Sequence, residues 1–192
     1  MTETKHFNLG TVFGRVVADS IERKESTRSE FLNLQVNVAG RRCGSVRAFC
    51  RIWKADRFEP LIDLLADRPN EPLFLKGFFD QFWDEKNNIF TTYTVYHWEP
   101  REGEPRAAFI LKGDVDVISR TKTGNRLLLN MERDGQEKQR LELWMQDEKF
   151  LDVPEQGQLI EVKGYLRQEQ PEDDFGGSTG PVRPYVEELK IL

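Results

Sequence analysis

Hydrophobic and polar side chains alternate along several segments of the chain, most clearly from Gly44 to Trp53. Successive side chains of a β-strand point to opposite faces, so this segment would have one uncharged face and one face of arginines and aromatic rings. The inward set is Val46, Ala48, Cys50 and Ile52, and the outward set is Arg47, Phe49, Arg51 and Trp53. A row of alternating guanidinium and aromatic groups is typical of a surface that binds phosphates and stacks bases.

The same alternation predicts the other elements of the first half of the chain. The predicted strands are Thr11–Asp19, Phe31–Val38, Gly44–Trp53, Leu73–Gln81 and Asn88–Trp98, and apolar residues at helical spacing predict a helix over Lys54–Asp67. The polar segment Ser20–Glu30 has no apolar period and is expected to be a loop. Three strands, a helix and two strands is the order of an OB-fold, a five-stranded Greek-key barrel.

The second half of the chain repeats this plan more weakly. After a predicted linker at Glu99–Arg106, the expected strands include Ile110–Arg120, Arg126–Glu132 and Lys138–Gln146. The segment Leu75–Phe78 resembles Val162–Tyr165, which gives a repeat of about ninety residues, a period that suits tandem domains. Two differences stand out in the second copy. Its connection Asp147–Gly157 is too short for more than one helical turn, and a Gly/Pro/acid-rich insert runs from Gln168 to Pro184.

These patterns together predict an all-β protein made of two tandem OB-fold barrels, the first with a helix between its third and fourth strands. The predicted domains are residues 1–100 and 107–192. With 38% hydrophobic and 11% aromatic residues, the chain has enough apolar material for real cores.

The net charge and the distribution of charges along the chain lead to different conclusions about nucleic-acid binding. A net charge of −5 argues against nucleic acid, whose binding proteins usually carry a basic footprint. However, residues 1–100 hold equal numbers of basic and acidic side chains, so the whole excess of acid lies in residues 101–192. Between positions 41 and 57 six basic side chains meet only one acidic one, Asp56. The sequence therefore predicts a local basic patch on an acidic protein.

Other classes of function find little support in the sequence. The two cysteines, Cys43 and Cys50, form no CxxC pair, and His6 and His97 provide no metal-ligand spacing, so we expect reduced thiols and no metal or other cofactor. No phosphate-binding glycine loop, nucleophile elbow or HExxH motif occurs, and we expect no enzyme activity. Neither an apolar span nor a signal-peptide layout is present, so a cytoplasmic protein without a membrane partner is the expectation.

The first half of the chain resembles the bacterial single-stranded DNA-binding protein family, and the whole chain resembles a tandem OB-fold variant of it. Three features carry the likeness: the opening Gly14-Arg15-Val16, the polar face of Asn33, Gln35 and Asn37, and the strand from Arg47 to Trp53. The resemblance implies binding of single-stranded DNA with little sequence preference, in replication, recombination or repair.

Candidate binding residues follow from the predicted outer faces and from the hairpin formed by the fourth and fifth strands. They are Arg41, Arg42, Arg47, Phe49, Arg51, Trp53, Lys76, Phe78 and Trp83 in the first half, and Arg140 and Trp144 in the second. Glu142 stands between the last two and would repel phosphate, so the second domain is expected to bind weakly or to contact proteins. Its remaining cationic candidates are Arg120, Lys122 and Arg126.

Several alternatives stay open at this point. The aromatic row could instead pack against a subunit or loop, which would make the protein an interaction scaffold or oligomerisation module in a nucleic-acid-processing complex. The adjacent Phe82 and Trp83 fit either a stacking platform or a dimer patch. The pattern does not separate DNA from RNA. It also leaves open a homo-oligomer and contacts with other replication or recombination proteins.

Overall fold

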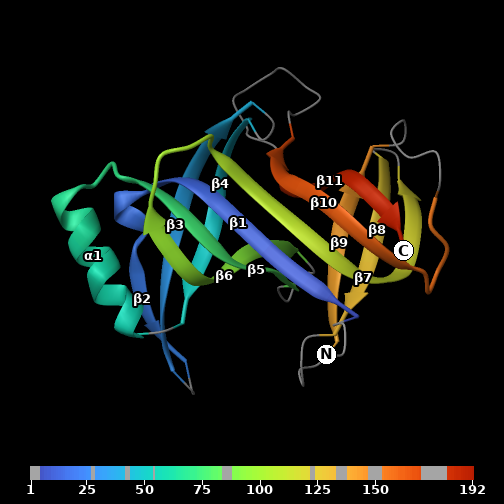
Figure 1. Ribbon diagram of the computed structural model, residues 1–192, viewed down its shortest axis with the longest axis horizontal. Coiled ribbons are helices and arrows are strands. Elements are labelled where there is room, and N and C mark those ends of the chain that lie inside the picture. The colour runs from blue at the N-terminus through green and yellow to red at the C-terminus, as the bar shows by residue number, and fades with distance from the viewer. Residues whose placement is uncertain are drawn as a thin grey trace. The chain divides into compact units, whose positions relative to one another are not determined.

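The chain forms strands over most of its length, with one α-helix among the described residues (Figure 1). A computed structural model describes residues 5–26, 29–41, 44–53, 55–83, 88–121, 124–132, 138–146, 153–169 and 181–192. It divides into an N-terminal unit, Gly10–Ala107, and a C-terminal unit made of Ala108–Leu192 and the residues up to Leu9. The expected all-β class is confirmed.

The N-terminal unit closes five strands into a circuit. The elements up to its end are β1 (Phe7–Val16), η1 (Ala18–Ser20), β2 (Glu22–Glu25), β3 (Glu30–Gly40), β4 (Gly44–Ile52), η2 (Ala55–Arg57), α1 (Phe58–Asp67), β5 (Pro72–Trp83) and β6 (Ile89–Pro100). Hydrogen bonds connect β1 to β5, β5 to β6, β6 to β4, β4 to β3 and β3 back to β1. All of these pairs are antiparallel except β4 with β6, and the short β2 adds to the outer edge of β3.

The inward faces of these strands form the core of the unit. The predicted alternation of β4 is confirmed, because its four inward side chains are at most 2% exposed. Helix α1 buries Phe58, Leu61 and Leu65 on one face and ends at Asp67, as predicted, but it begins at Phe58 because the preceding residues form η2. Since α1 follows β4 and precedes β5, the predicted position of the helix in the strand order is also confirmed.

The C-terminal unit closes five strands in the same order of connections. Its strands are β7 (Arg106–Thr121), β8 (Gly124–Met131), β9 (Gln139–Met145), β10 (Leu159–Gln168) and β11 (Val182–Ile191). The pairs β7–β8, β8–β9, β11–β10 and β10–β7 are antiparallel, and β9–β11 is parallel. The repeat seen in the sequence thus corresponds to a repeated strand order.

A Lys-Gly step bends the fourth strand of each circuit. The register of β5 against β6 shifts between Lys76 and Gly77, and that of β10 against β11 shifts between Lys163 and Gly164. A Cβ on Gly77 would come within 2.2 Å of the Thr94 carbonyl oxygen, and one on Gly164 within 2.1 Å of the Tyr185 carbonyl oxygen. Glycine is therefore required at both bulges by the close approach of the neighbouring strand.

The expected loop at Ser20–Glu30 is wrong in part, because it contains the end of η1 and the strand β2. All four side chains of β2 are exposed and charged, so no apolar alternation marked it, and it is held by backbone pairing of Glu22–Glu25 with residues of β3. The first strand also differs from its predicted span. It starts at Phe7 and ends at Val16, where the Ser20 hydroxyl donates a hydrogen bond to the Val17 carbonyl oxygen at 2.6 Å and turns the chain.

Several other boundaries differ from the sequence-based expectation. The predicted linker at Glu99–Arg106 is shorter, since β6 extends to Pro100 and β7 begins at Arg106. Most of the Asp147–Gly157 connection and of the Gln168–Pro184 insert lies outside the described residues. Within the described part of the chain, no helix has the length and apolar character needed to cross a membrane.

Candidate nucleic-acid interface

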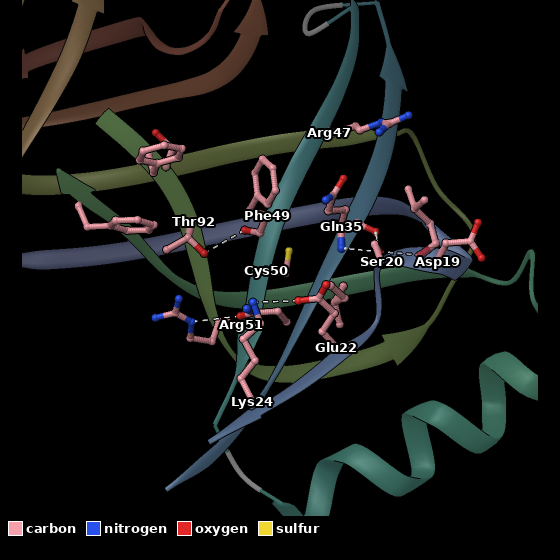
Figure 2. A pocket seen from close by; sticks show the side chains of 16 residues that line it. Asp19, Ser20, Glu22, Lys24, Gln35, Arg47, Phe49, Cys50, Arg51 and Thr92 are labelled. Atoms are coloured by element: carbon pink, nitrogen blue, oxygen red, sulfur yellow. Dashed lines mark hydrogen bonds and ion pairs between the residues drawn. The ribbon is translucent and has the colours of Figure 1, made fainter. Parts of the chain in front are cut away.

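A cleft of about 620 Å³ opens on the outer face of β3 and β4 in the N-terminal unit (Figure 2). β2 and η1 border it on one side, and β6 and the end of β5 border it on the other. The lining residues are Val17, Asp19, Ser20, Glu22, Lys24, Asn33, Leu34, Gln35, Arg47, Phe49, Cys50, Arg51, Phe82, Phe90, Thr91 and Thr92. Three of the predicted binding residues, Arg47, Phe49 and Arg51, therefore meet in one cleft.

The register between β3 and β4 explains why these side chains share the cleft. Arg47 pairs with Asn37, Phe49 with Gln35, and Arg51 with Asn33, so the polar face predicted for β3 lies beside the arginine and aromatic face of β4. Side chains directly opposite in an antiparallel pair have Cβ atoms about 5 Å apart. An amide side chain therefore lies next to each of Arg47, Phe49 and Arg51.

Phe49 is the most exposed ring of the row, with half of its surface accessible. Its backbone is fixed, because the Thr92 hydroxyl donates to the Phe49 carbonyl oxygen at 3.2 Å and β4 pairs with both β3 and β6 there. An exposed ring on a rigid strand offers a stacking face without a cost of ordering the backbone on binding.

Arg51 is held in place by aromatic and polar neighbours. Its guanidinium carbon lies 4.7 Å from the ring centroid of Phe31 and 5.6 Å from that of Trp53, and these two rings are 4.8 Å apart. Its Nε donates to Asn33 Oδ1 at 3.2 Å. The cation–π contacts and this hydrogen bond orient the guanidinium group before any ligand arrives. Trp53 itself does not line the cleft but supports Arg51 from the side.

Phe31 is a member of this cluster that the sequence-based list of binding residues omits. It occupies the same outward position along β3 as Asn33 and Gln35, so the strand period placed it on the binding face. Only 9% of its surface is exposed, because Trp53 and Arg51 cover it.

A second aromatic surface comes from the β5–β6 hairpin. Phe82 and Phe90 stack with ring centroids 5.3 Å apart and planes tilted by 14°, and both line the cleft that holds Phe49. Both rings keep more than two-fifths of their surface exposed. The neighbouring Trp83 is paired with Ile89 and does not line the cleft, because adjacent strand residues face opposite sides. Phe90 was not among the predicted binding residues.

The other predicted residues of the first half that the structure describes are not brought into the cleft. Phe78 packs on Tyr96 with ring centroids 5.1 Å apart, and Lys76 pairs with His97 across the hairpin. Arg41 is exposed in the turn after β3, and Arg42 lies outside the described residues.

The charges lining the cleft are mixed. Lys24, Arg47 and Arg51 face Asp19 and Glu22, and Lys24 Nζ lies 2.9 Å from Glu22 Oε2. Arg47 is exposed and forms no ion pair with any described residue. The Cys50 thiol is neutral at physiological pH, because burial raises its pKa far above the usual range. The lining is thus cationic by one charge, with Arg47 available to an incoming anion.

The chain shares its fold with the single-stranded DNA-binding protein of Thermus aquaticus. The wild-type structure of that protein superimposes with a TM-score of 0.67 at 14% sequence identity, covering 98% of this chain and 94% of the other. A deletion variant of the same protein gives a TM-score of 0.65 at 16% identity, covering 98% and 95%. No family model matches the sequence, and no curated protein is significantly similar to it by sequence.

The Thermus aquaticus protein matches this chain over nearly its whole length. The two units of the chain nevertheless differ in the side chains on and around the third strand of each circuit. In the C-terminal unit, β9 is the counterpart of β4 and carries Arg140, Glu142 and Trp144 on one face. Trp144 is only 9% exposed, and the Arg183 guanidinium carbon lies 3.9 Å from the centroid of its ring system. Arg126 also contacts this ring, at 5.8 Å. The Trp144 ring is therefore covered by side chains of its own unit.

The cations around Trp144 are paired with carboxylates. Arg126 lies 3.5 Å from the buried Glu142, Arg140 lies 2.6 Å from Asp116, and Arg183 lies 3.0 Å from Glu169. Burial and a 2.6 Å hydrogen bond to the same Glu169 raise the pKa of Tyr185 to about 12, so its hydroxyl remains a donor. Of the other cationic candidates, Arg120 is exposed at the end of β7, and Lys122 lies outside the described residues.

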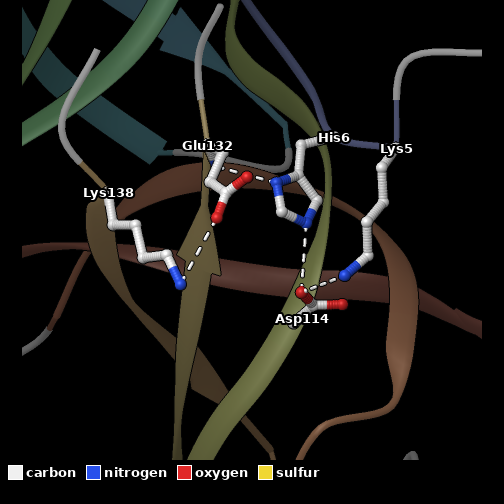
Figure 3. A network of polar contacts seen from close by, with 5 residues as sticks. All are labelled: Lys5, His6, Asp114, Glu132 and Lys138. Atoms are coloured by element: carbon white, nitrogen blue, oxygen red, sulfur yellow. Dashed lines mark hydrogen bonds and ion pairs between the residues drawn. The ribbon is translucent and has the colours of Figure 1, made fainter. Parts of the chain in front are cut away.

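Within the C-terminal unit, a polar network connects Lys5 and His6 to a residue of β7 and to the residue that follows β8 (Figure 3). The side chain of His6 is 5% exposed; its Nδ1 accepts the backbone N–H of Glu132 at 2.7 Å, and its Nε2 lies 3.2 Å from Asp114 Oδ2. Lys5 Nζ donates to the same carboxylate oxygen at 2.7 Å. Burial alone would raise the pKa of Asp114, but the hydrogen bonds and charges of Lys5 and His6 outweigh it and lower the pKa. This network is structural and involves none of the predicted binding residues.

Proposed function

We propose that this protein binds single-stranded DNA with little sequence preference, and that the cleft of the N-terminal unit is its main contact. The observation that carries the proposal is the row of Arg47, Phe49 and Arg51 along one exposed strand face, beside the stacked rings of Phe82 and Phe90. Every base has a π-face, so exposed rings between cations bind a single strand whatever its sequence. The fold shared with the Thermus aquaticus single-stranded DNA-binding protein supports the same assignment.

The two strand circuits are proposed to be tandem OB-fold barrels, with domains at residues 1–100 and 107–192. Their support is the shared order of connections, in which the first strand pairs with the second and fourth and the third runs parallel to the fifth. In OB-folds the face of the second and third strands binds oligonucleotides, and the cleft opens on the corresponding strands β3 and β4.

The C-terminal unit is proposed to contribute little affinity. Arg183 covers Trp144, and the carboxylates of Glu142, Asp116 and Glu169 neutralise the nearby arginines. A nucleotide would have to displace these groups before it could stack or pair there. This unit would instead extend the protein or contact other proteins.

The cellular role that fits such a protein is the protection of exposed strands in replication, recombination or repair. The stacking rings accept RNA bases as readily as DNA bases, so competition between oligo-dT and oligo-rU is the way to separate the two ligands.

Binding of fluorescein-labelled oligo-dT, followed by anisotropy at about 50 mM salt, tests the proposal. The logarithm of the affinity should fall linearly with the logarithm of the salt concentration, since phosphate contacts release counterions. Phe49→Ala should weaken binding by about fivefold to a hundredfold, because a stacked base contributes about 1–3 kcal/mol. Phe7→Ala removes a comparably exposed ring outside the cleft and is the matched control.

Two results would contradict the proposal. One is the absence of oligo-dT binding by the unaltered protein at low salt. The other is a Phe49→Ala variant that binds as well as Phe7→Ala but has a changed sedimentation mass, which would indicate a protein-interaction face.

A further inference from the structure

The strand β2 places a pair of opposite charges in the cleft. Side chains alternate along this strand, so Glu22 and Lys24 face the cleft while Arg23 and Glu25 face away from it. On the far side, Arg23 contacts Glu59 of α1. The segment was expected to be a loop, so neither Glu22 nor Lys24 was a predicted binding residue.

The β-sheet register brings this pair next to the row that carries the proposed function. Glu22 pairs with Asn33, and Asn33 pairs with Arg51, so these three side chains lie in one line across three strands. Lys24 pairs with Phe31, whose ring supports Arg51. Figure 2 shows the ion pair between Lys24 and Glu22 as a dashed line.

We propose that Lys24 is a phosphate contact of the cleft and that Glu22 is a built-in counter-ion that limits the affinity of the cleft for single-stranded DNA. This inference rests on the proposed function. The pair is weak in water, because both side chains are more than half exposed, so a phosphate can take Lys24 from Glu22. Glu22 then remains in the cleft as an unpaired negative charge that repels the bound phosphates.

The exchange has a consequence for the salt dependence of binding. The carboxylate of Glu22 offsets the charge of Lys24, so the two side chains together are neutral toward the phosphate chain. Lys24 therefore adds little to the salt dependence while Glu22 is charged. Without that carboxylate, the contact would add about 0.7 to the slope of log affinity against log salt.

The test compares Glu22→Gln with Glu59→Gln in the full chain, using oligo-dT and a salt series. Both variants raise the net charge by one and remove the partner of one β2 cation, but only Glu22 lines the cleft. Glu22→Gln should bind about fivefold tighter at low salt, the size expected for one exposed charge, with the slope steeper by about 0.7. Glu59→Gln should stay within about twofold of the unaltered protein, and Lys24→Gln should bind more weakly.

The outcomes separate this inference from the proposed function. If the unaltered protein does not bind oligo-dT, the proposed function fails, and the inference fails with it. If the protein binds but Glu22→Gln and Glu59→Gln change the affinity equally, only bulk charge matters and the inference alone is wrong. An unchanged affinity of Lys24→Gln would likewise overturn the inference alone. Circular dichroism and urea unfolding show whether each variant keeps the overall fold and stability of the unaltered protein.

Discussion

Arg47 and Arg51 lie four residues apart on the same face of β4 but have different surroundings. Arg51 is stacked on Phe31 and Trp53 and hydrogen-bonded to Asn33, whereas Arg47 is exposed. A guanidinium group that is already oriented gives a planar stacking surface, while an exposed one acts mainly as a positive charge. The two arginines should therefore respond differently to a substitution that keeps the charge and removes the planar group.

We predict that Arg51→Lys weakens oligo-dT binding by about fivefold, since the cation–π and planar contacts are worth about 1 kcal/mol. The slope of log affinity against log salt should not change, because lysine keeps the charge. Arg47→Lys, the matched control on the same strand, should stay within about twofold. Equal losses in both variants would show that Arg51 gains nothing from its aromatic neighbours.

A second prediction at this scale concerns Asp114, whose pKa is lowered in the folded protein. A lowered folded-state pKa means that the carboxylate stabilises the fold above its unfolded-state pKa of about 3.9, and that this stabilisation is lost as the pH falls through the folded-state value. Asp114→Asn should therefore reduce the free energy of unfolding by about 1 kcal/mol at pH 6, with a difference that shrinks below about pH 4.

Urea unfolding of the unaltered protein and of Asp114→Asn between pH 6 and pH 2 measures this difference. Asp63→Asn on the exposed face of α1 serves as a charge control. A difference that persists unchanged at pH 2 would mean that Asp114 acts through its shape rather than through its charge.

At the scale of the element, the strands with an alternating apolar face were the ones that could be predicted. The two faces of β4 followed from residues 44–53, the polar face of β3 followed from residues 31–38, and the place of β4 in the strand order followed from the succession of predicted elements. The strand β2 was not predicted, because a fully charged edge strand shows no apolar period. Phe90 was not predicted as a binding residue, because its place in the cleft depends on the hairpin register that stacks it on Phe82. The sequence of a single strand does not contain that register.

The bulge in β5 gives a prediction at this scale. Gly77→Ala would push a methyl group against the Thr94 carbonyl oxygen, with the backbone of both strands in the way, and should cost about 2–3 kcal/mol of the free energy of unfolding. Gly44→Ala is the control. Gly44 has φ of +65° but an open space around it, so alanine there should cost only about 1 kcal/mol of backbone strain. Chemical denaturation of both variants gives the comparison, and equal costs would contradict the steric argument.

At the scale of the whole molecule, the two units share a strand order and differ in what covers the third strand of each. The sequence indicated the repeat and the altered charge pattern around Glu142. It did not indicate that Arg183 would cover Trp144, because that contact depends on the parallel pairing of β11 with β9. In the N-terminal unit the aromatic and cationic side chains face a cleft, and in the C-terminal unit they pack against one another.

This difference predicts opposite effects for two tryptophans. Trp53→Ala should weaken oligo-dT binding by about fivefold through the loss of support for Arg51, with a modest effect on unfolding. Trp144→Phe should leave the affinity within about twofold but lower the free energy of unfolding by about 1–2 kcal/mol, because a nearly buried ring system becomes smaller. Anisotropy and urea unfolding measure the two effects, and a large affinity loss in Trp144→Phe would show that the C-terminal unit binds DNA.

The boundary between the units, which falls after Leu9, has a practical consequence for genetics. The N-terminal unit is encoded by one continuous stretch of the gene, but the C-terminal unit is not, because it includes the first residues of the chain. A gene cut at the linker would leave His6 without the Asp114 and Glu132 contacts that bury it, and would deprive the other half of its N-terminal residues. Exchanging a unit between relatives would therefore require two splice points, one on each side of the N-terminal unit.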